Sequence, residues 1–184
     1  MKLSLELMKI VLAVSPPLHI KLDDKDPPVL LYTDASDVPD PRMVVGGVLI
    51  LPPPAAQMKF FSWVVPQPVV DAWISKSSCL GQLELLAAPV ALSTWEDDLR
   101  RRQVIHFVDN DSANLVRGYS PKQDSCQLVG EYWTSAARSS IDLHLDRVEP
   151  KSNTADGPSR LQFSLMHHMG ASPPVVKKDI CTYG

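Results

Sequence analysis

Four acidic residues stand in short motifs that could build a metal-dependent catalytic site. They are Asp34 in LLYTDAS, Glu84 in GQLELLAAPVAL, Asp109 in VIHFVDNDSA and Asp156 in NTADGPSR. The two motifs with Asp34 and Asp109 end apolar runs of the β type, and Glu84 lies in an apolar helical run. Carboxylates gathered at strand ends repel one another unless cations lie between them, so the set indicates Mg²⁺ or Mn²⁺ and chemistry on phosphates.

Each of these residues also has an ordinary structural interpretation. Asp34 is compatible with a turn aspartate, because Asp and Ser are common turn residues. Glu84 fits the solvated side of an amphipathic helix, although a buried glutamate would need a partner or a metal. Asp156 fits the first turn of a helix, where the helix dipole favours a negative charge. Asp111 precedes the helical run SANLV, so we assign it to helix capping rather than to the site.

Composition and charge limit the classes of function. The chain has 184 residues, a hydrophobic content of 45% and a charged content of 21%, which favours one folded domain with short tails. A net charge of −3 excludes a general polyanion-binding protein. The three cysteines are odd in number and lack CxxC spacing, so we expect reduced thiols in an intracellular protein, cytoplasmic or nuclear. No run is long enough to span a membrane, and the segment 3–14 favours a short amphipathic helix over a signal peptide.

The hydrophobic periodicity predicts a mixed sheet with helices on its faces. Pro89 is expected to kink or interrupt the helix around Glu84, and Ser78 is a candidate N-cap for that helix. The pair Gly46 and Gly47 permits a close approach of other atoms to its strand. The predicted strands are 29–36, 43–51, 59–65, 104–109 and 141–148, and the predicted helices are 3–14, 80–99, 112–117 and 124–138, the last capped by Asp124 or Ser125.

The ordered motifs resemble the ribonuclease H domain of retroelement reverse transcriptases, of the retrotransposon type. The resemblance rests on TDAS, a GGVL strand, LELLA with a following AL and W, FVDN, and N-x-x-AD-x-x-SR, and it covers about residues 29–160. We therefore expect a ribonuclease H-like domain at 29–165 and a tail at 166–184. The helix and Pro-rich linker at 1–28 would resemble the end of a preceding polymerase or connection region, as in a polyprotein.

The resemblance implies an α/β fold whose five-stranded mixed sheet has the order 3-2-1-4-5, with helices on both faces. It implies hydrolysis of the RNA strand of an RNA/DNA hybrid with two Mg²⁺ or Mn²⁺ ions held by the four acidic residues. Asp34 would bridge both ions, Glu84 and Asp109 would hold one, and Asp156 the other. The implied partners are the hybrid and a polymerase domain of the same polyprotein, with no membrane. Ser36, Asn110 and Asn153 are candidates for contacts to the substrate's 2′-hydroxyls, with capping and turn support as the alternative.

Two departures from the family pattern favour a slower enzyme. Many family members carry a histidine in the loop before the last aspartate, whereas the link from Val148 to Asp156 contains none. A kink at Pro89 would also displace the carboxylate of Glu84. The alternative function is therefore a catalytically weak or silent ribonuclease H-like module that binds hybrids or serves a structural role. A proofreading exonuclease is disfavoured, because it would need Asp-x-Glu where this chain has Asp34, Ala35 and Ser36.

Overall fold

The computed structural model describes residues 26–37, 42–73, 79–108, 118 and 123–172. The predicted helices 3–14 and 112–117 and the candidate cap Ser78 lie outside these residues. Gly118, which directly follows the second of these ranges, has a left-handed φ of 64°. In the described part of the chain, no helix is long and apolar enough to cross a membrane.

A five-stranded sheet forms the centre of the molecule, and it has the predicted order β3-β2-β1-β4-β5. The first three strands form an antiparallel meander, while β1 pairs in parallel with β4 and β4 pairs in parallel with β5. Because β1 and β4 are parallel neighbours, their carboxyl ends lie at the same edge of the sheet. The strands are β1 Val29–Ser36, β2 Val44–Ile50, β3 Met58–Val64, β4 Gln103–Val108 and β5 Asp142–Arg147.

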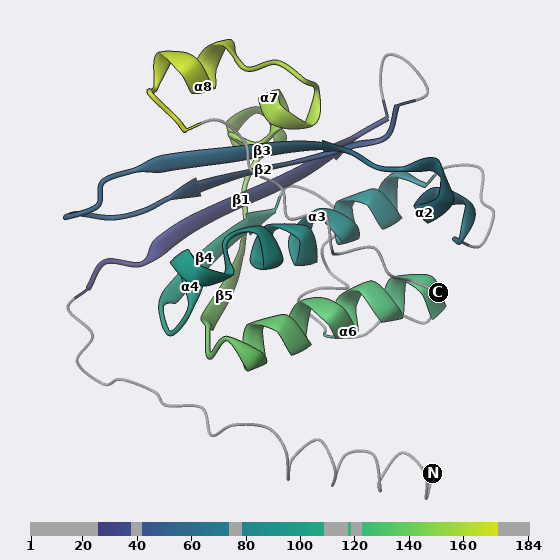
Figure 1. Ribbon diagram of the computed structural model, residues 1–184, viewed down its shortest axis with the longest axis horizontal. Coiled ribbons are helices and arrows are strands. Elements are labelled where there is room, and N and C mark those ends of the chain that lie inside the picture. The colour runs from purple at the N-terminus through teal and green to yellow at the C-terminus, as the bar shows by residue number, and fades with distance from the viewer. Residues whose placement is uncertain (1–25, 38–41, 74–78, 109–117, 119–122, 173–184) are drawn as a thin grey trace, which may run out of the picture.

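Helices cover both faces of this sheet, as Figure 1 shows. On one face lie α3, Leu80–Thr94, and α6, Gln123–Arg138, which pack against each other. The opposite face carries α7, Asp156–Ser159, and α8, Ser164–His168. The remaining helical segments are α2 Gln67–Asp71, α4 Glu96–Leu99 and the 3₁₀ turn η1 Pro150–Ser152.

Of the two effects expected of Pro89, interruption of the helix around Glu84 is wrong, whereas a kink stays a prediction. Helix α3 continues through Pro89 and ends at Thr94, and Trp95, with φ −114° and ψ 26°, separates it from α4. A proline removes one backbone hydrogen bond, but residues 85–92 of this helix are all buried. Packing on every side therefore holds the helix together where its own hydrogen-bond ladder is incomplete. Two predicted ends also move: α3 has Cys79 as N-cap, without a side-chain bond, and α6 begins at Gln123, before Asp124 and Ser125.

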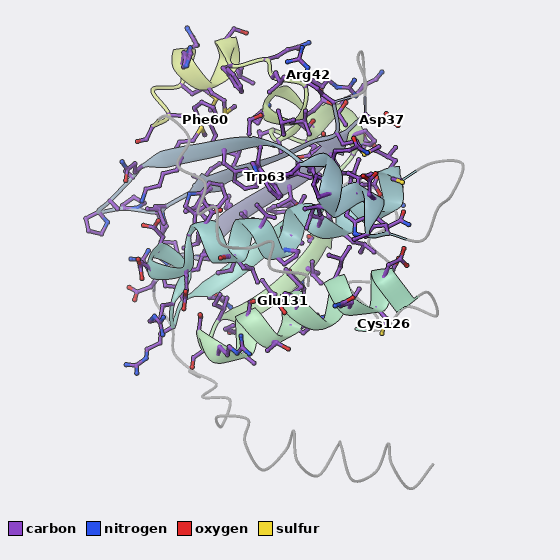
Figure 2. All side chains as sticks on the ribbon, turned by 45° about the vertical axis from the view of Figure 1, so that its right-hand side comes forward. Asp37, Arg42, Phe60, Trp63, Cys126 and Glu131 are labelled. Carbon is purple, nitrogen blue, oxygen red and sulfur yellow. The ribbon has the colours of Figure 1, made fainter. Side chains whose placement is uncertain are left out.

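Two apolar clusters lie on opposite sides of the sheet. The larger one joins the sheet to α3 and α6 and includes Leu31, Phe61 and Leu86, each fully buried. The smaller one consists of Val48, Phe60, Ala155 and Met166, beneath α7 and α8. Successive side chains of a strand point to opposite faces, so neighbouring residues of β3 serve different clusters. In Figure 2, Phe60 lies on the side of α8 and Trp63 on the side of α3.

Candidate active site

Asp34 lies on β1 with its side chain buried toward α7. It is opposite Gly46 of β2 in the antiparallel register, and only 8% of the residue is exposed. The hydroxyl of Ser159, in the last position of α7, donates a short hydrogen bond to Oδ2 of Asp34. A buried carboxylate requires such partners, because it has lost the hydrogen bonds of water. Asp34, a predicted metal ligand, thus lies beneath α7, the short helix that carries the predicted ligand Asp156.

A close approach between α7 and β2 makes this arrangement possible. A Cβ atom on Gly46 would lie 2.4 Å from the backbone nitrogen of Ser159 and 2.8 Å from the carbonyl carbon of Pro158. Gly47 is equally tight, since its Cβ would lie 2.4 Å from Cε1 of Phe61. The prediction that the glycine pair permits close approach is therefore confirmed. At Gly46 the closely packed atoms are those of the backbone of α7 itself.

Asn153 fixes the turn that leads into α7. Its Nδ2 donates to the carbonyl oxygen of Thr33 at 3.0 Å, and its Oδ1 accepts from the backbone N–H of Ala155 at 3.1 Å. The side chain is buried and holds β1 and the turn together, which is the turn support that the sequence offered as an alternative to substrate contact. Ser36, at the end of β1, is also buried. Asn110 lies outside the described residues.

Asp156 begins α7 and is far more accessible than Asp34. Its Oδ1 accepts from Nε of Arg160 at 2.7 Å, and 47% of its side chain is exposed. The backbone carbonyl oxygen of Asp156 lies 2.9 Å from the hydroxyl of Ser159. The hydroxyl of Ser159 therefore contacts the carboxylate of Asp34 but only the main chain of Asp156. The carboxylate of Asp156 is paired with Arg160 instead.

Glu84 lies on α3, which packs against β1 from the opposite face of the sheet. The residue is half-buried, whereas the neighbouring Leu83 and Leu85 are buried. Asp109 lies outside the described residues. In the sequence it stands two residues beyond Phe107, as Asp34 stands two beyond Tyr32, and Tyr32 and Phe107 are paired in the parallel register.

A divalent cation needs oxygen ligands of a suitable type and several of them close together. Carboxylate oxygens are the ligands that Mg²⁺ and Mn²⁺ prefer, so Asp34 and Asp156 fit by type. Among the residues described, no three His, Cys, Asp or Glu side chains are grouped closely enough to hold a metal ion. Asp34, Glu84 and Asp156 therefore do not form such a group by themselves.

Sequence reasoning missed a buried polar network next to Asp34. Nε2 of His106 lies 2.9 Å from Oγ1 of Thr33, and Nδ1 of the same ring lies 2.7 Å from the hydroxyl of Tyr132. Complete burial lowers the pKa of His106 from 6.5 to about 3, and burial raises the pKa of Tyr132 well above 10. The ring is therefore neutral at pH 7, with one nitrogen donating and the other accepting. The only signal in the sequence was one histidine in the otherwise apolar run VIHFV.

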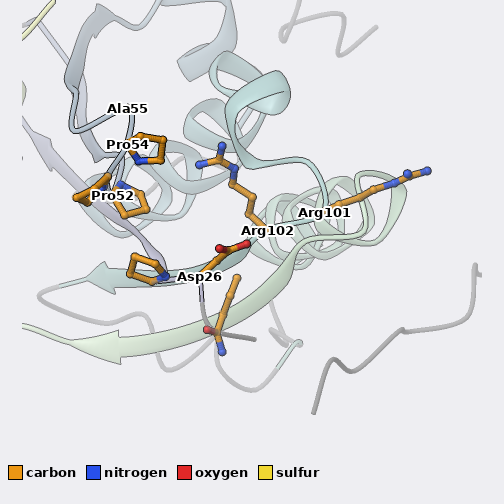
Figure 3. A pocket seen from close by; sticks show the side chains of 9 residues that line it. Asp26, Pro52, Pro54, Ala55, Arg101 and Arg102 are labelled. Carbon is orange, nitrogen blue, oxygen red and sulfur yellow. The ribbon is translucent and has the colours of Figure 1, made fainter. Parts of the chain in front are cut away.

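A cavity of about 230 Å³ lies at the other end of β1 and shares no residue with the predicted site. Figure 3 shows its lining, which includes Asp26, Arg101 and Arg102 with the prolines of the β2–β3 turn. Pro27 and Asp34 are seven residues apart along an extended strand, roughly 20 Å. This cavity is therefore distinct from the surroundings of Asp34.

Comparison with known proteins identifies the fold. No family model and no curated protein matches the sequence. Among solved structures, ribonuclease H1 from Halobacterium salinarum is 15% identical with a TM-score of 0.53, covering 77% of this chain and 99% of that one. The N-terminal ribonuclease H domain of a Mycobacterium tuberculosis protein is 13% identical with a TM-score of 0.53, covering 78% and 98%. LC11-RNase H1, isolated from compost by a metagenomic approach, is 12% identical with a TM-score of 0.51, covering 76% and 98%. With these neighbours and the sheet order 3-2-1-4-5, the chain has a ribonuclease H-like fold.

Proposed function

We propose that this chain is a ribonuclease H that hydrolyses the RNA strand of RNA/DNA hybrids and derives from a retroelement reverse transcriptase. The observation that supports the proposal is the placement of α7, which begins with Asp156 and whose Ser159 donates to the buried carboxylate of Asp34. The helix that carries Asp156, α7, contacts β1, which carries Asp34, although the two residues are more than a hundred positions apart in the sequence. The sequence motifs around them, TDAS and NTADGPSR, are among those that resemble the retroelement enzymes.

In the proposed enzyme, Asp34, Glu84, Asp109 and Asp156 would hold Mg²⁺ or Mn²⁺ ions. When bound, such ions activate water and neutralise the negative charge that develops on the phosphate. The protein's own contribution is to keep the carboxylates in place. The hydroxyl of Ser159 and the pairing of β1 with β2 hold Asp34, while the ion pair with Arg160 holds Asp156.

The substrate and the cellular setting form part of the same proposal. A net charge of −3 gives the chain little long-range attraction to a nucleic acid. A polymerase domain in the same polyprotein would supply that attraction by keeping the hybrid close. We place the protein inside the cell, in the cytoplasm or nucleus, where such hybrids arise.

Two observations favour a catalytically weak or silent module as the second candidate. Arg160 occupies Oδ1 of Asp156, and the segment between Val148 and Asp156 has no histidine. A cation would have to compete with the arginine for the carboxylate. The enzyme is favoured because all four acidic positions are filled.

A cleavage assay on a labelled RNA/DNA hybrid, with Mg²⁺ or Mn²⁺, tests the proposal. We expect the wild type to cut the RNA strand and Asp109→Asn to lose at least about 100-fold in rate, which corresponds to roughly 3 kcal/mol of transition-state stabilisation. Asp111→Asn is the matched control, because it removes a neighbouring carboxylate that we assign to capping.

The two negative results of this assay have different meanings. Equal cleavage by the wild type and Asp109→Asn discards the site. A wild type that binds the hybrid at high protein concentration without cutting it leaves the silent module in place of the enzyme.

A further inference from the structure

We propose that the part of the sheet on β1, β4 and β5 that faces away from α3 and α6 docks a basic amphipathic segment of a partner protein. The apolar side chains of that segment would lie on β1 and β4, and its lysines or arginines would lie opposite aspartates of β5. The inference goes beyond the proposed function, because it needs neither the predicted catalytic residues nor a cation.

Helices α7 and α8 cover one half of this face. Helix α7 contacts β1, β2 and β3. The small apolar cluster beneath the two helices takes Val48 from β2 and Phe60 from β3, and Tyr32 of β1 is partly buried against it. The cluster therefore reaches as far as β1, and the half of the face on β4 and β5 lies beyond it.

Four apolar side chains continue the face from β1 to β4. In the parallel register Leu30 is paired with Ile105 and Tyr32 with Phe107, so all four side chains point to the same side of the sheet. The rings of Tyr32 and Phe107 are stacked, with their centroids 4.8 Å apart. Leu30, Ile105 and Phe107 are half-buried and belong to neither apolar cluster of the described residues. We term these four residues the apolar platform.

Strand β5 gives the apolar platform an acidic margin. Asp146 is paired with Phe107, and His144 and Asp142 lie two and four residues before Asp146, so these β5 side chains share the face of the platform. Asp142 and Asp146 are both exposed, and neither carboxylate forms an ion pair with a described residue. Oδ1 of Asp146 accepts from the backbone N–H of Arg147 at 2.8 Å. Apolar surface and negative charge thus lie side by side.

The charges of this surface decide between a nucleic acid and a protein as its partner. Aromatic rings can stack on unpaired bases. Two exposed aspartates beside the rings would repel the phosphates of such a strand, and the net charge of −3 adds to that repulsion. A protein segment that carries lysine or arginine next to apolar side chains is complementary to both parts of the surface. We therefore assign the surface to a basic amphipathic segment.

The dimensions of the surface suit one helix that lies along the strands. Strands β1 and β5 are two strand spacings apart, roughly 10 Å, which is about the diameter of an α-helix with its side chains. Asp142 and Asp146 are about 13 Å apart along β5, and two helical turns advance about 11 Å. A helix with an apolar stripe, and with lysines two turns apart on one flank, could contact the apolar platform and both aspartates.

Fluorescence anisotropy of the full chain with a labelled synthetic peptide tests the inference. The probe is a peptide of leucine and lysine, about 18 residues long, whose leucines form one helical stripe. We expect the wild type to bind this peptide at low salt, and to bind a peptide of the same composition in scrambled order at least about tenfold more weakly. A wild type that binds neither peptide, or both equally well, would overturn the inference.

Reversal of the two charges on β5 tests the acidic margin. Asp142→Lys combined with Asp146→Lys should weaken binding of the lysine peptide by about tenfold or more at low salt. The same variant should gain binding of a leucine–glutamate peptide with the same pattern. The matched control is Asp97→Lys combined with Glu131→Lys, on α4 and α6 of the opposite face, which changes the net charge equally. Equal effects of the two double variants would assign the attraction to net charge alone and overturn the inference.

Ile105→Thr tests the apolar platform. Threonine keeps the β-branched shape that suits a strand but adds a hydroxyl, so binding of the lysine peptide should weaken about 3–10-fold with an unchanged circular dichroism spectrum. Unchanged binding would overturn the inference, and the exposed β5 positions still decide it if Ile105→Thr does not fold. Two other occupants would also overturn it. One is a single-stranded oligonucleotide that binds the wild type more tightly than the lysine peptide, and the other is a second copy, shown by dimerisation in sedimentation that Ile105→Thr abolishes.

Discussion

The two faces of the sheet are held by different kinds of interaction. On the face of α3 and α6, a large apolar cluster packs two long helices against four strands, and no single contact defines the arrangement. On the other face, α7 has only four residues. It is fixed by the Asn153 bond to Thr33, the Ser159 bond to Asp34 and the contact with Gly46.

This difference separates stability from placement. An apolar cluster tolerates small shifts, because its energy depends mainly on the area removed from water. A few directed bonds and one close backbone contact tolerate much less, but they define where a side chain lies. Of the predicted ligands, Asp34 and Asp156 are on the face where such contacts dominate, whereas Glu84 lies on α3 at the apolar face.

The largest loss of stability should come from the apolar face. Leu86 is fully buried in α3, so Leu86→Ala should lower the free energy of unfolding by about 2–5 kcal/mol. Urea denaturation measures this loss, and the folded fraction should keep its rate of hybrid cleavage within a few-fold. Leu165→Ala, at a side chain that is 52% exposed, should change stability by less than about 0.5 kcal/mol. A large fall in activity of folded Leu86→Ala would contradict the separation of the two faces.

On the opposite face, a single methyl group should harm activity more than stability. Gly46→Ala would bring a Cβ into the backbone of α7, so the helix must shift away from Asp34. We expect a loss of about 1–3 kcal/mol in unfolding free energy and of at least about 100-fold in cleavage. Gly130→Ala in α6 is the matched control, since nothing lies within 4 Å of its Cβ, and it should stabilise the protein by roughly 0.5–1 kcal/mol. Wild-type activity in Gly46→Ala would show that the position of α7 is unimportant.

The smallest effect concerns His106, a fully buried polar residue on the apolar face. Its folded pKa of about 3 lies below the ordinary 6.5. Between these values the unfolded chain binds a proton that the folded chain does not, so stability falls as pH drops below 6.5, by up to about 1.4 kcal/mol per unit. Unfolding measured from pH 7 to pH 5 should depend less on pH in His106→Leu. An unchanged slope in His106→Leu would contradict the burial of a neutral ring.

Much of the fold follows from local patterns in the sequence. The runs at 29–36, 43–51 and 59–65 predicted the meander because apolar β-type runs and short turns are local properties, and the glycine pair marked a close contact correctly. The continuity of α3 through Pro89 could not be read locally, because burial by distant strands decides it. The same holds for the contact of Ser159 with Asp34 and for the link from His106 to Thr33 and Tyr132. These depend on side-chain directions across elements that lie far apart in the chain.

The outer strands carry a further consequence. After α8 the chain returns to β3, where Ser172 bridges Lys59 and its N–H donates to the carbonyl oxygen of Met58. At the far side, β5 turns Asp142, His144 and Asp146 toward solvent. An uncovered edge strand can pair with a strand of another molecule. A segment that covers the edge, or a row of polar side chains along it, makes such pairing less favourable. A truncation that removes Ala171 and all residues after it should therefore promote self-association through the exposed edge of β3.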